Sequence, residues 1–136
     1  CGARSRSMSV MLDTDHCIAI LRGTLNIDRY TEPQDTLFIS AITVSELIYG
    51  AMKSARPEHH RHQVELLLEG VTVLAFGESE AKCCGVLKDN LRRQGKLIAE
   101  PALQIASIAL ESDLPLATHN QRHFDRIPGL ELLDWM

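Results

Sequence analysis

The fold is decided first at residues 9–23, which read SVMLDTDHCIAILRG. The mostly apolar stretch before Asp13 predicts a short buried strand, and the Ile, Ala and Leu residues that follow predict a helix ended by Gly23. Thr14 or Asp15 is the expected N-cap, because their side-chain oxygens can accept hydrogen bonds from free backbone N–H groups. A strand that leads through an acid into a helix is the unit that parallel α/β sheets repeat.

The rest of the chain continues the alternation of strands and helices. Further strands are expected from short apolar runs at residues 36–40, 71–74, 115–118 and 130–133. Helices are expected at residues 25–34, from Thr43 with Glu46 as its capping-box partner, from Pro57 to Gly70, at 79–93, from Pro101, and within 119–127. This alternation predicts an α/β fold of three layers, with a parallel central sheet and helices on both faces.

Length and composition are those of one globular domain. The 136 residues suffice for a single core, and we expect this domain to span residues 8–136. Residues 1–7 are polar and patternless, and we interpret them as a cloning scar or a disordered segment. Aromatic residues make up only 4% of the chain, so the core should be aliphatic. No apolar run approaches the roughly 18 residues of a membrane span, so we expect a cytoplasmic protein without a membrane partner.

The charge of the chain constrains its partners. A formal net charge of -4 argues against a general nucleic-acid binder, which is usually basic overall. A local basic rim can still hold a phosphate backbone beside an acidic site. The candidates for such a rim are Arg92, Arg93, Lys96, His119, Arg122, His123 and Arg126. An ordinary charged surface explains the same residues equally well.

Polar side chains stand where the expected strands end. Asp13 follows the first strand, Ser40 ends the second, and Glu46 lies about one turn into the next helix. Thr118 and Asn120 come at the end of the fourth strand. Because parallel strands end at one edge of their sheet, these side chains should gather there. Carboxylate, hydroxyl and amide oxygens favour Mg²⁺ or Mn²⁺, which can polarise a phosphate and activate a water for attack on phosphorus.

Other interpretations of the acids remain open at this point. Asp13 could simply cap the first helix, and Glu46 could simply be the capping partner of Thr43. An apolar strand followed by the sequence DTD also resembles the opening motif of haloacid-dehalogenase-type phosphatases, in which the first Asp is the nucleophile. That family needs a downstream lysine and a late acidic pair, and this chain has no late G-D-x-x-x-D sequence.

Several segments in order carry a family resemblance. They are MLDTDHCI (11–18), ISAITVSELIYGA (39–51), RRQGKLI (92–98) with QIASIA (104–109), and ATHN (117–120) with RHF (122–124), IPGL (127–130) and DW (134–135). Each segment alone is a weak signal, but together, at this spacing, they are strong. From about Met8 to Trp135 the chain resembles the VapC-type toxins, the PIN-domain ribonucleases of bacterial toxin–antitoxin pairs.

The resemblance implies a ribonuclease that holds Mg²⁺ or Mn²⁺ on three or four acids and cuts phosphodiester bonds in structured RNA. It also implies a homodimer, a small VapB-like antitoxin with a segment in the active-site groove, and a larger complex on operator DNA. The first two acids carry over to Asp13 and Glu46, and the fourth position carries over to Asn120. The supporting residues are then Thr14, Asp15, Ser40 and Thr118.

The third acid of the family is missing. Its position is 102, where a helix start would favour a carboxylate, but alanine stands there. We therefore expect Ala102 to weaken metal binding and to impair cleavage. The alanine could be an engineered inactivating change, natural decay, or a loss for which Asp15 compensates. A second function also stays open, a catalytically dead PIN module that acts through antitoxin binding and operon repression.

Overall fold

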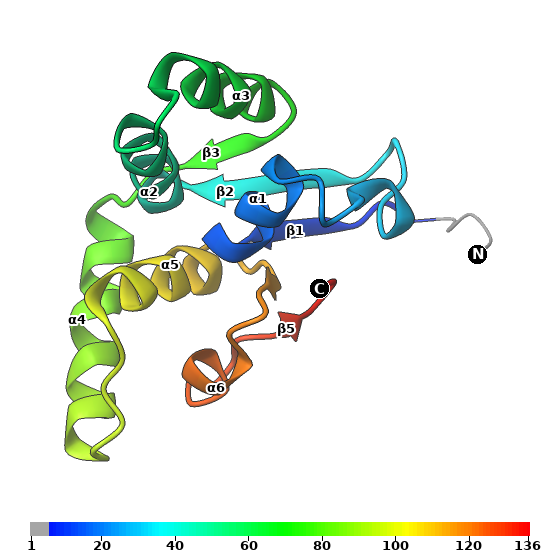
Figure 1. Cartoon of the computed structure of the whole chain (residues 1–136). Coiled ribbons are helices and arrows are strands. Elements are labelled where there is room, and N and C mark those ends of the chain that lie inside the picture. Colours follow the sequence, from blue (N-terminus) through cyan, green and yellow to red (C-terminus); the bar gives the residue numbers. More distant parts are fainter. Residues whose placement is uncertain (1–5) are drawn as a thin grey trace.

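The computed structural model describes residues 6–136, so most of the segment 1–7 interpreted as a scar lies outside the described residues. Within this range, five parallel strands form one sheet in the order β3-β2-β1-β4-β5 (Figure 1). The strands are β1 (Ser9–Leu12), β2 (Thr36–Ser40), β3 (Thr72–Leu74), β4 (Leu116–Ala117) and β5 (Leu132–Leu133). The first strand of the chain is therefore the central one.

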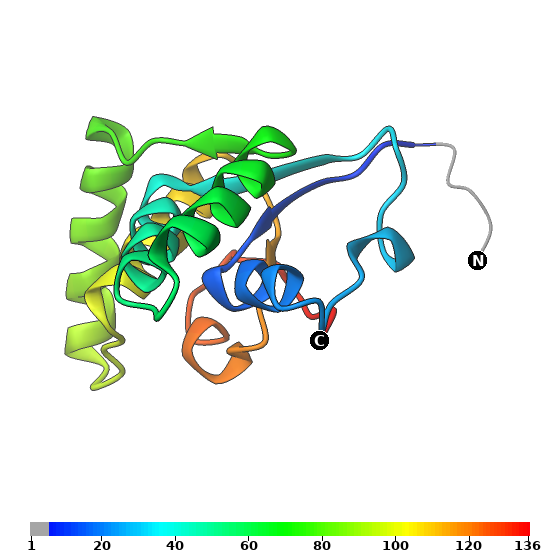
Figure 2. The same cartoon turned by 45° about the horizontal axis from the view of Figure 1, so that its top comes forward.

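Helices cover both faces of this sheet. They are α1 (Thr14–Leu21), α2 (Ala41–Met52), α3 (Pro57–Glu69), α4 (Glu78–Arg93), α5 (Glu100–Glu111) and the short α6 (Gln121–Phe124). In both views α2 and α3 lie side by side, and α4 and α5 form a second pair (Figures 1 and 2). None of the helices within residues 6–136 combines the length and apolar character that a bilayer crossing requires.

The two core clusters follow from the alternation of side chains along β1. Val10 and Leu12 point to one face and pack with residues of α1, α2 and α3. Met11 points to the other face and packs with residues of α4 and α5. These three residues of β1 are 0% exposed, as a strand covered on both faces requires. The expected three-layer α/β fold with a parallel central sheet is confirmed.

The first helix is capped by Asp13, the alternative that the sequence left open, and not by Thr14 or Asp15. Asp13 is its N-cap, and Asp13 Oδ1 accepts a hydrogen bond from the backbone N–H of Thr14 at 2.9 Å. The expectation of Thr14 or Asp15 as the cap was wrong. The physical reason is that both side chains are engaged elsewhere, that of Thr14 with Glu46 and that of Asp15 with His16.

The helix after β2 also begins earlier than expected. Ser40 is its N-cap, and Ser40 Oγ accepts a hydrogen bond from the backbone N–H of Thr43 at 3.0 Å. The predicted capping box of Thr43 and Glu46 is therefore wrong, because Ser40 is the first hydroxyl residue that reaches the free N–H groups of this helix. Glu46 is thereby free of a capping role.

Residues 25–34 form a single turn rather than the expected helix. The 3-10 helix η1 spans Ile27–Arg29, and the side chain of its N-cap Asn26 accepts a hydrogen bond from the backbone N–H of Asp28 at 3.1 Å. Pro33 disfavours helical geometry at the preceding residue, so the turn does not extend. The other expected helices and strands agree with the structure within one or two residues at their ends.

Candidate active site

Asp13 and Thr118 meet at the carboxyl edge of the sheet, because each directly follows a strand and β1 pairs with β4. Thr118 Oγ1 donates a hydrogen bond to Asp13 Oδ2 at 2.7 Å, and both side chains are buried. Burial raises the pKa of the Asp13 carboxyl above its usual value. The nearby charges of Asp15 and Glu46 act in the same direction, against the hydrogen bonds that Asp13 accepts. A cation beside Asp13 would relieve this cost, so the position suits a metal-binding acid.

Glu46 approaches the same edge from α2 and is held by a chain of hydroxyl groups. Thr14 Oγ1 donates a hydrogen bond to Glu46 Oε1 at 2.7 Å. Because this bond uses the single hydroxyl proton of Thr14, the Thr43 hydroxyl 3.0 Å away must donate to Thr14. Ser40 Oγ in turn donates to Thr43 Oγ1 at 3.2 Å. The exposed carboxylate of Glu46 is therefore oriented by side chains that extend from β2 across to α1.

Asp15 is bound to neighbouring groups of the protein. Its Oδ1 lies 2.8 Å from His16 Nδ1, and its Oδ2 accepts the backbone N–H of His119 at 2.9 Å and lies 3.3 Å from Thr118 Oγ1. Partial burial by itself would raise the pKa of Asp15, but the hydrogen bonds from His16 and His119 outweigh it and lower the pKa. Asp15 is thus an ionised support for the turn after β4. This geometry does not favour Asp15 as a replacement for the third acid that the family resemblance expects.

Ala102 lies in the first turn of α5 and is partly buried against the core beneath that helix. Its neighbour Glu100 forms an ion pair with Lys88 of α4 at 3.0 Å, which does not favour Glu100 in the place of the expected third acid. Among residues 6–136 there is no group of three or more His, Cys, Asp or Glu side chains placed to hold a metal ion. The residues present supply Asp13 and Glu46 as hard oxygen ligands for Mg²⁺ or Mn²⁺, but they do not complete a metal site.

Asn120 stands at the turn between β4 and α6. Its backbone N–H donates a hydrogen bond to Thr118 Oγ1 at 3.0 Å. Its side-chain nitrogen lies 2.9 Å from Nδ1 of His123, and the residue is exposed. In this structure Asn120 thus supports the hydroxyl that binds Asp13.

The basic residues proposed as a rim lie in two segments, the end of α4 and the loop from β4 to β5. Arg126 joins these segments, since its guanidinium donates a hydrogen bond to the backbone carbonyl of Lys96 at 3.2 Å. Arg92 and Arg93 are exposed, but both form ion pairs with Asp89, at 2.7 and 3.0 Å. Part of the positive charge of this rim is therefore offset within α4.

Sequence reasoning missed side chains that help to build the site. They are His16, Thr43, Asp134 and Trp135. Thr43 was assigned only a capping role, and His16 stood in the sequence as one more residue of an amphipathic helix. The signal that could have found both is the same, a polar residue at a position that the helix pattern places in the core.

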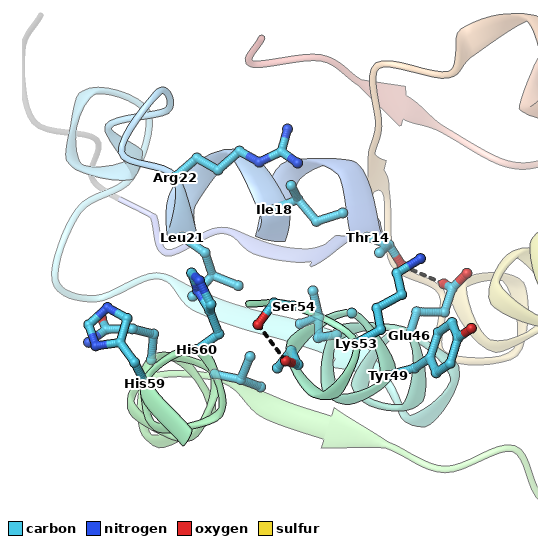
Figure 3. Close-up of a pocket in the computed structure, with 15 residues that line it drawn as sticks. Thr14, Ile18, Leu21, Arg22, Glu46, Tyr49, Lys53, Ser54, His59 and His60 are labelled. Atoms are coloured by element: carbon cyan, nitrogen blue, oxygen red, sulfur yellow. Dashed lines mark hydrogen bonds between the residues drawn. The ribbon is translucent and has the colours of Figure 1, made fainter. Parts of the chain in front are cut away.

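The site opens at Thr14 and Glu46 into a groove of about 950 Å³ between α1, α2 and α3 (Figure 3). Its apolar lining residues are Ile18, Leu21, Leu47, Ala51 and Val64. Its cationic and aromatic lining residues are Arg22, Tyr49, Lys53, His59 and His60. Lys53 Nζ lies 5.0 Å from the centre of the Tyr49 ring, which is 66% exposed. An apolar groove with basic walls suits a peptide segment with apolar anchors.

Comparisons with known proteins agree with this geometry. Residues 10–130 match the family described as PIN domain. The ribonuclease VapC2 of Haemophilus influenzae is 36% identical over 131 residues, which cover 95% of this chain and 99% of that protein. The tRNA(fMet)-specific endonuclease VapC of Shigella flexneri is 33% identical over 130 residues, which cover 94% and 98%. A chain of the DNA-bound VapBC structure from Salmonella typhimurium superposes with a TM-score of 0.85 at 32% identity, over 95% of this chain and 99% of that one.

These matches choose among the interpretations that the sequence left open. They extend over nearly the whole chain rather than over one motif, and the phosphatase interpretation of Asp13 is therefore wrong. The parallel sheet, the acids at its carboxyl edge and these similarities agree with one another. The chain belongs to the VapC-type ribonucleases of the PIN-domain family.

Proposed function

We propose that this chain carries the framework of a Mg²⁺- or Mn²⁺-dependent endoribonuclease for structured RNA, and that the alanine at position 102 impairs its activity. One observation carries the proposal. Asp13 and Glu46, from different elements, lie at one sheet edge and each accepts a hydrogen bond of 2.7 Å from a threonine hydroxyl. Ala102 stands at the helix start where the family resemblance expects the third acid.

The roles of the retained side chains follow from their bonds. Asp13 accepts one hydrogen bond on each oxygen, from the Thr118 hydroxyl and from the Thr14 N–H, and Glu46 accepts one on Oε1 from the Thr14 hydroxyl. Each carboxylate oxygen has a second lone pair, so both acids can still hold a cation. A divalent ion, when bound there, supplies a water of lowered pKa and offsets charge on the phosphate. Asn120, hydrogen-bonded to Thr118, is placed to orient the scissile phosphate.

The proposed substrate is structured RNA in the cytoplasm. One relative at 33% identity is named a tRNA(fMet)-specific endonuclease, which supports this substrate class. The rim of Arg92, Arg93, Lys96, Arg122 and Arg126 would contact the phosphate backbone, while the acids act on one phosphodiester bond. His119 and His123 of the same rim lie beside Thr118 and Asn120.

The proposed partner is a small VapB-like antitoxin. Structural relatives are VapBC complexes from Haemophilus influenzae and Salmonella typhimurium, the latter bound to DNA. We extend this to a toxin homodimer within a larger complex on operator DNA. The groove supports the assignment, because a peptide in it would end beside Thr14 and Glu46 and would keep RNA from the acids.

A second candidate function is a catalytically dead PIN module that binds antitoxin and contributes to operon repression. The observation that favours it is the incomplete acid set among residues 6–136. Whether the alanine is engineered or inherited, the present sequence would then act through the groove alone.

Restoration of the acid tests the proposal. Ala102→Asp should increase metal-dependent cleavage of total RNA by about 100-fold or more, and chelation of the metal should abolish the gain. Ala102→Asn is the matched control, because it adds nearly the same volume without a charge, and it should stay near the alanine form. If the aspartate variant binds antitoxin tightly but cleaves no faster than the alanine form, the binding-module function is correct instead.

A further inference from the structure

His16 is a fully buried polar side chain beside the candidate active site. It lies in α1, three residues after Asp13, and is 0% exposed. Both of its ring nitrogens are engaged. The backbone N–H of Trp135 donates a hydrogen bond to Nε2 at 3.0 Å, and Nδ1 lies 2.8 Å from Asp15 Oδ1. A buried imidazole held at both nitrogens cannot rotate without the loss of both bonds.

The bond from Trp135 decides which ring nitrogen of His16 carries the hydrogen. A backbone N–H can only donate, so Nε2 must accept and cannot carry a hydrogen. The neutral ring then has its hydrogen on Nδ1, which donates to the carboxylate of Asp15. Asp134 Oδ1 lies 3.8 Å from Nε2, beyond hydrogen-bond distance, so it does not compete with Trp135.

Asp15 transmits this orientation to the turn after β4. Its Oδ2 accepts the backbone N–H of His119 at 2.9 Å, which holds the backbone directly after Thr118. Thr118 in turn donates its hydroxyl to Asp13 Oδ2 at 2.7 Å. Hydrogen bonds, together with the peptide link between Thr118 and His119, thus connect the segment at Trp135 through His16 and Asp15 to the first acid of the site.

The anchor of this set is well held. The Trp135 ring stacks on Tyr30 with ring centres 5.5 Å apart and an interplanar angle of 16°. The same ring lies 6.1 Å from the His16 ring. Asp134, one residue earlier, binds Nδ1 of His119 through Oδ2 at 2.9 Å. The end of the chain therefore contacts both His16 and the turn that His16 orients.

We propose that His16 is a positioning residue for the reaction: through Asp15 it sets the backbone after β4 and hence the direction of the Thr118 hydroxyl toward Asp13. The inference rests on the proposed function, because it takes Asp13 to be a metal-holding acid. The alternative is that His16 only fills the core and ties down the end of the chain. If His16 is a positioning residue, its bond from Nδ1 to Asp15 matters more for the reaction than the bond that Nε2 accepts from Trp135. If His16 only fills the core, the two bonds matter equally.

A pair of matched variants separates the two nitrogens. In His16→Asn the side-chain amide nitrogen can take the place of Nδ1 and donate to Asp15, but nothing reaches Trp135. In His16→Gln the amide oxygen can take the place of Nε2 and accept from Trp135, but the donor to Asp15 is lost. Both remove one bond of the buried imidazole, so thermal unfolding should change to a similar degree in the two.

The readouts are metal affinity and RNA cleavage, measured on the full chain with Ala102→Asp. Manganese affinity comes from the paramagnetic resonance signal of free Mn²⁺. His16→Gln should lower manganese affinity and kcat by up to about 10-fold, less than the loss of a direct partner of a ligand usually costs, because His16 acts on Asp13 only through Asp15 and the turn after β4. His16→Asn should recover most of that loss. Equal effects of the two variants on affinity and kcat would overturn the inference and leave His16 a core residue.

Nuclear magnetic resonance tests the inference without any activity. In the chain as it is, the ¹⁵N shifts of His16 should show hydrogen on Nδ1, and the amide proton of His119 should be shifted downfield by its bond to Asp15. That downfield shift should vanish in His16→Gln and persist in His16→Asn. A hydrogen on Nε2, or a His119 amide unchanged in both variants, would overturn the inference. If instead these signals behave as expected while Ala102→Asp cleaves no RNA, the proposed function fails and the positioning geometry stands.

Discussion

The two halves of the candidate site differ in their acids, although both are firmly packed. The half formed by β1 and α2 presents Asp13 and Glu46, each bonded to a threonine hydroxyl at 2.7 Å. The half formed by α5 and the turn after β4 presents Ala102 and the neutral Asn120. Nevertheless α5 is the best-buried helix of the fold, and Leu103, directly after Ala102, is 0% exposed.

This difference leads us to expect that packing in the core, and not the side chain at position 102, sets the place of α5 at the site. Alanine at position 102 is a good helix former and costs the fold little, whereas the family resemblance expects a carboxylate there. We therefore expect chemistry and stability to be separable in this molecule. Substitutions can test that separation, first by removal of a retained acid and then by disturbance of the scaffold.

Removal of the first acid should have the largest effect. In the Ala102→Asp form, Asp13→Asn should lower RNA cleavage by about 100-fold or more, because a neutral amide holds a divalent ion poorly. Stability should change by no more than about 1 kcal/mol, because the loss of a buried charge offsets the loss of one of the two hydrogen bonds that Asp13 accepts, from Thr118 and from the Thr14 N–H. Single-turnover cleavage and urea unfolding measure the two effects. Asp113→Asn, at an exposed loop position, is the control and should change neither.

A substitution in the core beneath position 102 should have the opposite result, a loss of stability. Leu103→Ala should lower the free energy of unfolding by about 2–5 kcal/mol, because it opens a cavity in the core on the α4–α5 face. Leu110→Ala, on the same helix but only partly buried, should cost less. Urea unfolding measures both variants. A cost below about 1 kcal/mol for Leu103→Ala would mean that the second half of the site is held by something other than packing.

The meeting of Asp13 and Thr118 could be predicted from sequence because the information is local. Each follows an apolar strand, and parallel strands end at one edge of a sheet. The cap of α2 could not be decided in the same way. Ser40 and Thr43 are both hydroxyl residues only three positions apart, and either satisfies the local capping rule. What distinguishes them is the bond of Thr43 to Thr14, which exists only after α1 and α2 pack together.

The role of His16 shows a second limit of sequence reasoning. Its bond to Trp135 joins residues 119 positions apart, so no local pattern contains it. The expectation of an acid at position 102, in contrast, rests only on the family resemblance, because the residues alone do not mark a helix start as a ligand position. Local rules thus predicted the sheet and its acids, whereas contacts between distant elements assign the supporting side chains.

The hydroxyl groups that orient Glu46 allow a test with a smaller expected effect, in the half of the site that has both Asp13 and Glu46. Thr14→Val keeps the side-chain volume but removes the donor to Glu46 and the acceptor of the buried Thr43 hydroxyl. It should lower the free energy of unfolding by about 1 kcal/mol, and it should weaken manganese binding by the Ala102→Asp form. Thr14→Ser keeps the hydroxyl and should behave like threonine. Equal manganese affinity in the valine and serine forms would show that Glu46 needs no orientation.

A substitution in the proposed basic rim, which would contact the RNA outside both halves of the site, should give the smallest effect. Arg92→Ala should weaken RNA binding only a few-fold. It should also reduce the slope of log affinity against log salt concentration by about 1, as expected for the loss of one phosphate contact. The effect is small because Arg92 is exposed and already paired with Asp89. Arg61, similarly exposed and paired with Glu65 on α3, is the matched control, and Arg61→Ala should leave RNA binding unchanged. Under the proposed function, the alanine at position 102 allows RNA binding to be titrated with little cleavage. Equal effects of the two variants would mean that RNA does not bind along the end of α4.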